Sequence, residues 1–211
     1  MNDIIYLISG SPEIDFEYLK SLNLNKKKVY AIDSGYKICN RLKIIPKKII
    51  GDFDSSSYKK VVSMYDEEKV FKYPKKKNKS DTELGIDMAL SNGYKKIIVL
   101  NATGGRIDHE FFNIFLLLKS PGKIVVQNKL AEMYAIKKQI INKIKLKKGQ
   151  YFSLLPLSEI KNLSIKNAEY ELENKDIQLN SLTLSNRALS NNLEIHFDEG
   201  KLLIYILKGK K

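Results

Sequence analysis

The most constraining feature of this sequence is a series of short apolar runs that alternate with helix-forming stretches through the first 130 residues. Each run stops at glycine or polar residues. A strand that is apolar along its whole length must be covered on both faces, which is typical of a parallel sheet between helices. The pattern predicts a Rossmann-like α/β domain over residues 1–130. The expected strands are Ile4–Ser9, Val29–Ile32, Ile49–Ile50, Lys69–Tyr73, Lys95–Leu100 and Lys123–Gln127, and the expected helices are Ile14–Leu22, Lys37–Leu42, Ser57–Met64, Asp81–Ser91 and Glu110–Leu118.

The pattern changes from about Met133, where apolar and polar residues alternate and helix signals become few. This alternation is typical of strands with one buried face, and it predicts a smaller antiparallel β-sandwich or open barrel over residues 131–211. A turn at 198–200 followed by Leu202–Leu207 predicts a hairpin. The alternating positions are Ile140, Asn142, Ile144 and Leu146, then Ile177, Leu179, Leu182 and Leu184, then Leu193, Ile195 and Phe197.

The charge balance is strongly basic, with 37 lysines and arginines against 24 acidic residues and a net charge of +13. Nucleic acid is the obvious candidate partner. However, the arginines are limited to Arg41, Arg106 and Arg187, and lysine is a hydrated point charge without arginine's planar fork. We therefore expect a solvated surface and no specific nucleic-acid partner. The single cysteine, Cys39, and the lack of long apolar runs predict a cytoplasmic protein without a membrane partner.

Polar side chains follow several of the expected strands, where ligands bind to open parallel sheets. Asp33 follows one strand, and Asp52 and Asp54 follow another within a Gly-Asp-Phe-Asp-Ser turn. Carboxylates two residues apart in extended backbone project to one side and suit Mg²⁺, which takes a few carboxylates together with phosphate oxygens. The alternative is a turn whose aspartates cap the next helix. With Asp81 as a further acid, we favour the metal.

Two other polar motifs begin expected helices. Ser80 and Glu83 fit a capping box, so Asp81 is either a residue of the first helical turn or a ligand aimed into the same crevice. The segment 103–109 combines paired glycines, which let the backbone approach an anion, with Arg106, which can grip phosphate bidentately. Asp108 could orient Arg106 or bind an amine or hydroxyl. A plain glycine turn with a capping aspartate is the alternative.

These motifs resemble those of the thiamine pyrophosphokinase (thiamine diphosphokinase) family, and the resemblance spans nearly the whole chain. It implies that ATP donates a diphosphate group to the hydroxyl of thiamine, giving thiamine diphosphate and AMP, with Mg²⁺ as cofactor. It also implies a homodimer whose active site lies at the subunit interface. The segments that carry the resemblance are Ala31–Gly35, Ile49–Ser55, Lys79–Leu84, Thr103–His109 with Asn113, Ser153–Leu157 and Ser185–Asn186.

The resemblance assigns roles to residues of this chain. It makes the first domain the ATP- and Mg²⁺-binding catalytic domain and the second the thiamine-binding domain. Two alternatives stay open: a related pyrophosphokinase that acts on another alcohol such as a pterin, and a basic nucleic-acid-binding protein. The implied catalytic residues are Asp54, Asp81 and Arg106; the metal ligands are Asp52, Asp54 and Asp81; the nucleotide-binding residues are Asp33, Gly35, Thr103, Gly104, Gly105, Arg106 and Asp108; and the thiamine-binding residues are Ser185 and Asn186.

Overall fold

The computed structural model describes residues 3–138, 141–181 and 183–209. The chain divides into two compact units, Met1–Leu116 with Val126–Asn128, and Leu117–Val125 with Lys129–Lys211. Strand β6 (Ile124–Gln127) contributes residues to both. Within the described residues, no helix combines the length and apolarity needed to span a membrane.

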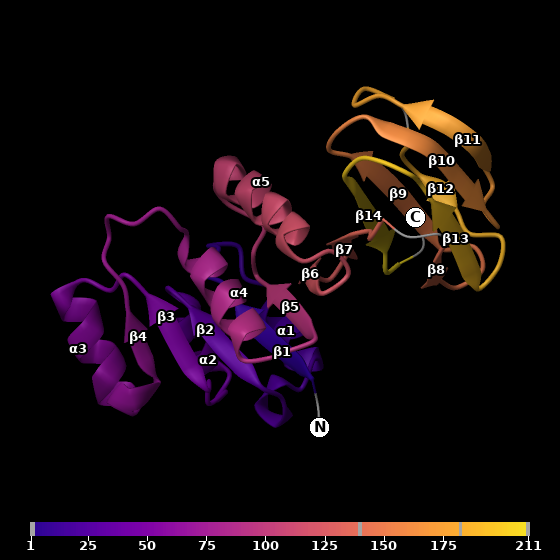
Figure 1. Ribbon diagram of the computed structural model, residues 1–211. Helices are drawn as coiled ribbons and strands as arrows, with labels where there is room; N and C mark the ends of the chain where they lie inside the picture. The colour runs from indigo at the N-terminus through magenta and orange to yellow at the C-terminus, as the bar shows by residue number, and fades with distance from the viewer. Residues whose placement is uncertain (1–2, 139–140, 182, 210–211) are drawn as a thin grey trace. The chain divides into compact units, whose positions relative to one another are not determined.

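The first unit is an α/β fold, as predicted (Figure 1). The central residues of β1, β2, β3 and β5 are apolar and mostly buried, which explains their apolar runs, whereas the edge strand β4 is only partly buried. The strands are β1 (Ile4–Ile8), β2 (Val29–Ile32), β3 (Lys48–Gly51), β4 (Val70–Lys72) and β5 (Lys96–Leu100), and the helices are α1 (Phe16–Ser21), α2 (Gly35–Arg41), α3 (Ser55–Met64), α4 (Asp81–Ser91) and α5 (Ile107–Phe115). Short 3₁₀ turns cover Leu24–Lys26, Glu67–Lys69 and Leu116–Lys119.

The sheet of this unit runs in the order β5-β1-β2-β3-β4, and its paired strands are parallel. The chain moves outward from β1 to β4 and then returns to the other side of β1 to form β5. The strand order therefore reverses between β1 and β5. In open α/β sheets, ligands bind outside the carboxyl ends of the strands at such a reversal, so the topology alone marks where a site belongs.

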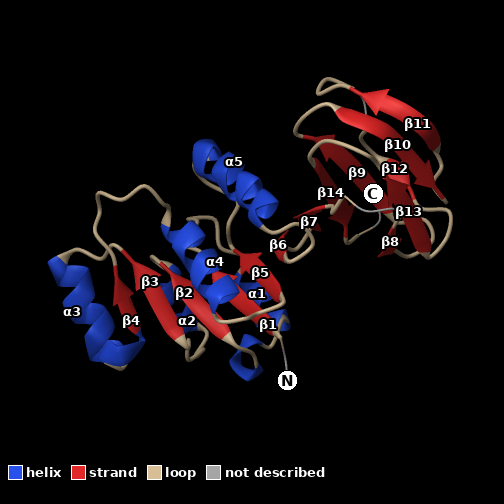
Figure 2. Cartoon of the chain, in the orientation of Figure 1, coloured by secondary structure: helices blue, strands red, loops and turns tan. Residues whose placement is uncertain are grey.

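The second unit is built from antiparallel strands in two sheets, as predicted for a sandwich (Figure 2). One part runs β12-β9-β14-β7 and the other β11-β10-β13-β8. Side chains from both, such as Phe152 and Ile204 from one and Leu163 and Ile195 from the other, share a single core. The strands are β7 (Ala131–Ala135), β8 (Asn142–Lys145), β9 (Tyr151–Pro156), β10 (Ile160–Lys166), β11 (Leu172–Ile177), β12 (Asn186–Arg187), β13 (Asn192–His196) and β14 (Leu202–Leu207).

Two expectations for this unit were wrong. The turn at 198–200 does not form a hairpin, because β13 pairs with β8 and β10 whereas β14 pairs with β7 and β9. The turn carries the chain from one sheet to the other, and Glu199 and Lys201 bond instead to the segment around Leu157–Lys161. The alternation of apolar and polar residues from Ile177 onward was also expected to mark a strand, but β11 ends at that residue. Ile140 and Leu182, two positions of the alternating pattern, lie outside the described residues.

Candidate active site

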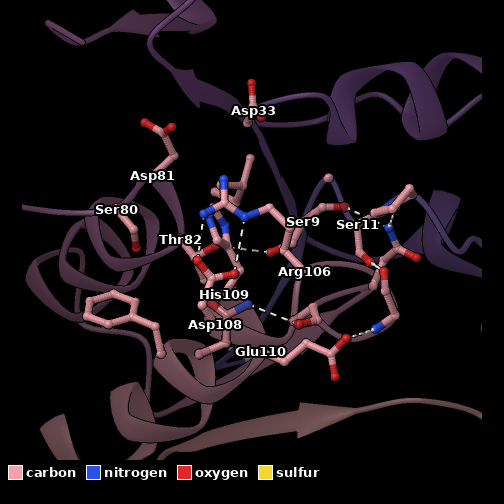
Figure 3. A pocket seen from close by; sticks show the side chains of 18 residues that line it. Ser9, Ser11, Asp33, Ser80, Asp81, Thr82, Arg106, Asp108, His109 and Glu110 are labelled. Carbon is pink, nitrogen blue, oxygen red and sulfur yellow. Dashed lines mark hydrogen bonds and ion pairs between the residues drawn. The ribbon is translucent and has the colours of Figure 1, made fainter.

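A cavity of about 700 Å³ opens at the carboxyl ends of β1 and β5, where the strand order reverses (Figure 3). One wall is the loop after β1, from Ser9 to Pro12, and another is the loop after β5 with the start of α5. The start of α4 supplies Ser80, Asp81 and Thr82. The cavity therefore lies where the topology of the first unit places a ligand site.

The two strand-end loops are tied together by side chains. Asn101 follows β5 with a left-handed backbone (φ 53°), which asparagine tolerates. Its side-chain amide donates to the carbonyl oxygens of Ser9 at 3.1 Å and Ser11 at 2.8 Å. The Ser11 hydroxyl in turn donates to the carbonyl of Gly104. These bonds give the cavity walls a defined separation before any ligand binds.

The paired glycines were predicted to approach an anion, and the structure shows a further reason for them. Gly104 and Gly105 have φ angles of +86° and +145°, and a Cβ on them would lie 2.7 Å from Glu13 and 2.8 Å from Pro12. Glycine is therefore required for this loop to pack against the chain after β1. The Gly104 N–H donates to Glu110 Oε1 at 2.7 Å, so this donor is already engaged.

Arg106 and Asp108 form a two-pronged pair at the cavity. Arg106 Nε lies 3.1 Å from Asp108 Oδ1, and the terminal guanidinium nitrogen lies 2.5 Å from Oδ2. The hydrogen bond from Arg106 lowers the pKa of Asp108 to about 2, and the same bond raises the pKa of Arg106. Both side chains are exposed. Since a guanidinium has five N–H donors and Asp108 accepts from two nitrogens, others stay oriented for a phosphate.

The predicted aspartates come from the ends of neighbouring strands and the start of α4. Asp33 follows β2 with φ 48°, and its N–H donates to the carbonyl of Ile50 on β3 at 2.7 Å. Burial raises the pKa of Tyr36, and the charges of Asp33 and Asp54 add to this rise. The acidic side chains therefore gather at one edge of the sheet.

Asp81 is the most enclosed of these acids, with 18% of its side chain exposed. Ser80 caps α4 by accepting from the Glu83 N–H at 3.1 Å, so the Asp81 carboxylate is not used as the cap. Burial raises the pKa of Asp81; Lys77 opposes that rise, and the charges of Asp52 and Asp33 add to it. Asp81 Oδ1 is buried, and it forms an ion pair with Lys77, whose Nζ lies 3.1 Å away.

Asp52 is also close to this ammonium group, with Oδ2 3.8 Å from Lys77 Nζ. Two carboxylates are thus within reach of one cationic atom, and the buried Asp81 oxygen is the nearer of the two. This donor set fits Mg²⁺, which commonly binds through one or two carboxylates and completes its shell with water and phosphate oxygens. Among the described residues no group of three or more His, Cys, Asp or Glu is placed to hold a metal alone, so phosphate oxygens would have to complete the site.

The structure brings together some of the predicted site residues and separates others. The cavity is lined by Asp33, Asp81, Gly104, Arg106 and Asp108. Of the other predicted residues of this unit, Asp52 lies beside Asp81 across Lys77. Asp54 caps α3 by accepting from the Ser57 N–H at 2.7 Å, which is the alternative left open by the sequence. Gly35, Thr103 and Gly105 support the neighbouring loops and are not among the lining residues.

Ser185 and Asn186 belong to the second unit. The Ser185 N–H donates to Ser153 Oγ at 3.0 Å. The Asn186 side chain is buried and is bonded to both backbone groups of Tyr170 at 3.0 and 2.8 Å. In this structure Asn186 therefore joins β12 to the loop before β11, and a role in thiamine binding stays a prediction.

Sequence reasoning missed Lys77, Ser9, Thr82 and Asn101. Lysines were expected to lie on a solvated surface, whereas Lys77 pairs with Asp81 from the loop before α4. Ser9 is buried, and its hydroxyl lies 3.3 Å from that of Thr82. A serine at the end of an apolar run is a feature of the sequence that could have indicated this position. Nothing local in the sequence marks Asn101 as the residue that joins the two loops.

The chain is similar to known proteins along nearly its whole length. Residues 19–127 match the family model of the thiamin pyrophosphokinase catalytic domain, and residues 138–202 match that of the thiamin pyrophosphokinase vitamin B1 binding domain. A thiamine pyrophosphokinase of Bacillus subtilis is 28% identical over 202 residues, covering 89% of this chain and 87% of that protein.

Solved structures agree with the sequence comparison. A thiamine pyrophosphokinase from Bacillus subtilis superposes with a TM-score of 0.81 at 25% identity, covering 97% of this chain and 98% of that one. A thiamin pyrophosphokinase from Geobacillus thermodenitrificans gives 0.82 at 25% identity and covers 98% of both chains. With both domain models matched in order, this chain belongs to the thiamin pyrophosphokinase family.

Proposed function

We propose that this chain is an ATP-dependent thiamine diphosphokinase, which transfers the diphosphate group of ATP to the hydroxyl of thiamine and releases AMP. The observation that carries the proposal is the cavity at the β1–β5 reversal, where Arg106, Asp33 and Asp81 converge in a chain of this family. In this proposal residues 1–130 hold ATP and Mg²⁺, and residues 131–211 hold thiamine. The family match to a vitamin B1 binding domain supports the second assignment.

The cavity residues support the positioning and charge neutralisation on which such a transfer depends. Arg106, held in plane by Asp108, would donate to phosphate oxygens with its remaining N–H groups and stabilise charge that develops on them. Asp33 and the loop from Gly104 to Arg106 would position the nucleotide. Asp52 and Asp81 would hold Mg²⁺, with Asp54 as a further candidate ligand; when bound, the ion would neutralise and polarise the phosphate groups.

Asp81 is our first choice for the base that accepts the thiamine hydroxyl proton. Its carboxylate is largely enclosed, and burial raises its pKa, which favours proton acceptance near neutral pH. The Ser9 and Thr82 hydroxyls lie beside it in the cavity lining. They could order the acceptor alcohol or a water there.

A homodimer is part of the proposal. Helix α5 carries Ile107, Phe111 and Phe115 at four-residue spacing, and these side chains are 69%, 56% and 51% exposed. An apolar stripe of this kind favours burial against another surface, and a second copy of the chain is the occupant that the family resemblance implies. Sedimentation analysis would test it: a monomer at micromolar concentration would contradict this part alone. The active site at the subunit interface and the cytoplasmic location stay predictions.

The decisive experiment incubates the purified protein with thiamine, ATP and Mg²⁺ and measures AMP and thiamine diphosphate together. Equal amounts of both products are expected. ADP in place of AMP would indicate transfer of a single phosphoryl group, and AMP formed only with another alcohol, such as a pterin, would indicate a different acceptor. Either result would overturn the proposed function.

A further inference from the structure

Lys77 differs from its neighbours in the lysine-rich segment between β4 and α4. Lys75 and Lys76 are exposed, whereas only 14% of the Lys77 side chain is exposed. Its ammonium nitrogen lies 3.1 Å from Asp81 Oδ1 and 3.8 Å from Asp52 Oδ2. A lysine is rarely enclosed unless its charge is paired, so this position indicates a specific role.

The charges around Lys77 indicate what this role is. Asp52 and Asp81 come from different elements, and two carboxylates drawn toward one place repel each other. One ammonium close to both offsets part of this repulsion. Asp33 adds a further negative charge close enough to affect Asp81. With three carboxylates against one ammonium, the cluster keeps a net negative charge, and it can still attract a second cation.

We propose that Lys77 is the internal counter-ion of the acidic site: it holds Asp52 and Asp81 together in the metal-free protein and occupies the position that a divalent ion takes when it binds. The inference rests on the proposed function, because that function supplies the ion. The ammonium and the ion compete for the same carboxylate oxygens, so binding of the ion requires Lys77 to withdraw. Lys77 is therefore a positioning residue that sets the metal affinity and keeps the empty site folded.

The test replaces Lys77 by methionine, which has similar length and no charge, with Lys76→Met as the matched control on the exposed neighbour. The probe is Mn²⁺ without nucleotide, followed by loss of the free-ion EPR signal, because Mn²⁺ uses the same carboxylate oxygens as Mg²⁺. Removal of a competing charge should tighten Mn²⁺ binding at least about fivefold, within the usual range of coupling between ligands. Thermal unfolding in EDTA should occur at a lower temperature in Lys77→Met than in the wild type, and the rise in melting temperature on adding Mn²⁺ should be larger. Lys76→Met should match the wild type in each measurement.

Unchanged or weaker Mn²⁺ binding by a folded Lys77→Met protein would overturn the inference. A variant that folds with Mn²⁺ but not in EDTA would support it. If Lys77→Met folds under neither condition, Lys77→Arg decides: it keeps the charge and should bind Mn²⁺ like the wild type, and a changed affinity would overturn the inference.

The outcome is separable from that of the proposed function. Wild-type protein that makes thiamine diphosphate, together with a Lys77→Met variant of unchanged Mn²⁺ affinity, would refute the counter-ion role alone. Tighter binding by the variant without any product from the wild type would refute the thiamine reaction alone.

Discussion

Gly35, the first residue of α2, is packed against the end of β1 so closely that a single methyl group should disturb the site. A Cβ at this position would lie 2.0 Å from the carbonyl oxygen of Ile8 and 3.0 Å from its carbon, where ordinary contact begins at 3.4 Å. The oxygen belongs to the backbone at the end of β1, a central strand of the sheet, so it cannot rotate away. In Gly35→Ala the helix and the strand must therefore separate by about 1.4 Å at this point.

Two opposing effects set the magnitude. Alanine is the better helix former by about 1 kcal/mol, whereas overpacking of a well-packed site costs about 1–3 kcal/mol, or more where backbone must move. With a gap far below normal contact, we expect the clash to prevail and a net loss of about 2 kcal/mol. For a chain of this length that corresponds to a fall in melting temperature of about 4–8 °C.

Thermal unfolding measures the total effect, and hydrogen exchange locates it. Peptides covering β1 and α2 should exchange faster in Gly35→Ala, whereas β10 in the second unit should not change. Gly209→Ala is the control, because a Cβ there would meet nothing within 4 Å. ATP binding should also weaken, since Ser34 Oγ donates to Gly10 O at 3.2 Å and links α2 to the cavity wall. A variant as stable as the wild type, or more stable, would show that helix propensity decides and that the packing argument is wrong.

Three other outcomes follow from the site and the core. Asp81→Asn should lower turnover at least about 100-fold if Asp81 accepts the proton, and near-normal turnover with unchanged metal dependence would exclude Asp81 as base and as ligand. Arg106→Lys removes the planar guanidinium held by Asp108 and should weaken ATP binding about tenfold. The control, Arg41→Lys, should leave ATP binding unchanged. Equal effects of the two substitutions in isothermal titration would contradict the proposed contact of Arg106 with phosphate. Burial raises the pKa of the Cys39 thiol to about 12, so the thiol should resist alkylation at pH 8 until the protein is unfolded, as mass spectrometry would show. Because the unfolded thiol ionises at lower pH than the folded one, the free energy of unfolding should also fall as the pH rises above about 9; rapid labelling of folded protein would refute both expectations.

The first unit was predictable because its signals are local. Buried parallel strands are marked by apolar runs, and the residues that follow β1, β2 and β5 line the cavity. The second unit was less predictable from the sequence. Whether the strand after 198–200 pairs with the preceding strand or crosses to another sheet depends on contacts with β7 and β9, which lie far away in the sequence. The polar and apolar alternation is the same in both arrangements.

The site residues also divide into those with a local signal in the sequence and those without one. Arg106 and Asp108 are two residues apart, and their pairing could be predicted from the sequence. Lys77 could not be recognised in the same way, because Lys75 and Lys76 beside it are exposed and its role depends on Asp52, which follows β3, as well as on Asp81. The loop contacts of Asn101 with Ser9 and Ser11 likewise span about ninety residues. Contacts that arise from tertiary packing have no local signal.

For each aspartate the sequence allowed two roles, helix cap or metal ligand. The structure distinguishes these roles because it shows which residue caps each helix. At α4 the cap is Ser80, so neither oxygen of Asp81 is used for capping, and the buried Oδ1 pairs with Lys77. At α3 the cap is Asp54 itself, which uses Oδ1 for the Ser57 N–H. A carboxylate that caps a helix is held by that hydrogen bond and has one lone-pair site fewer for a cation, and giving up the cap costs the helix about 1 kcal/mol. Asp81 and Asp52 therefore stand ahead of Asp54 as the carboxylates on which a metal would depend, and the lysine between them marks the position.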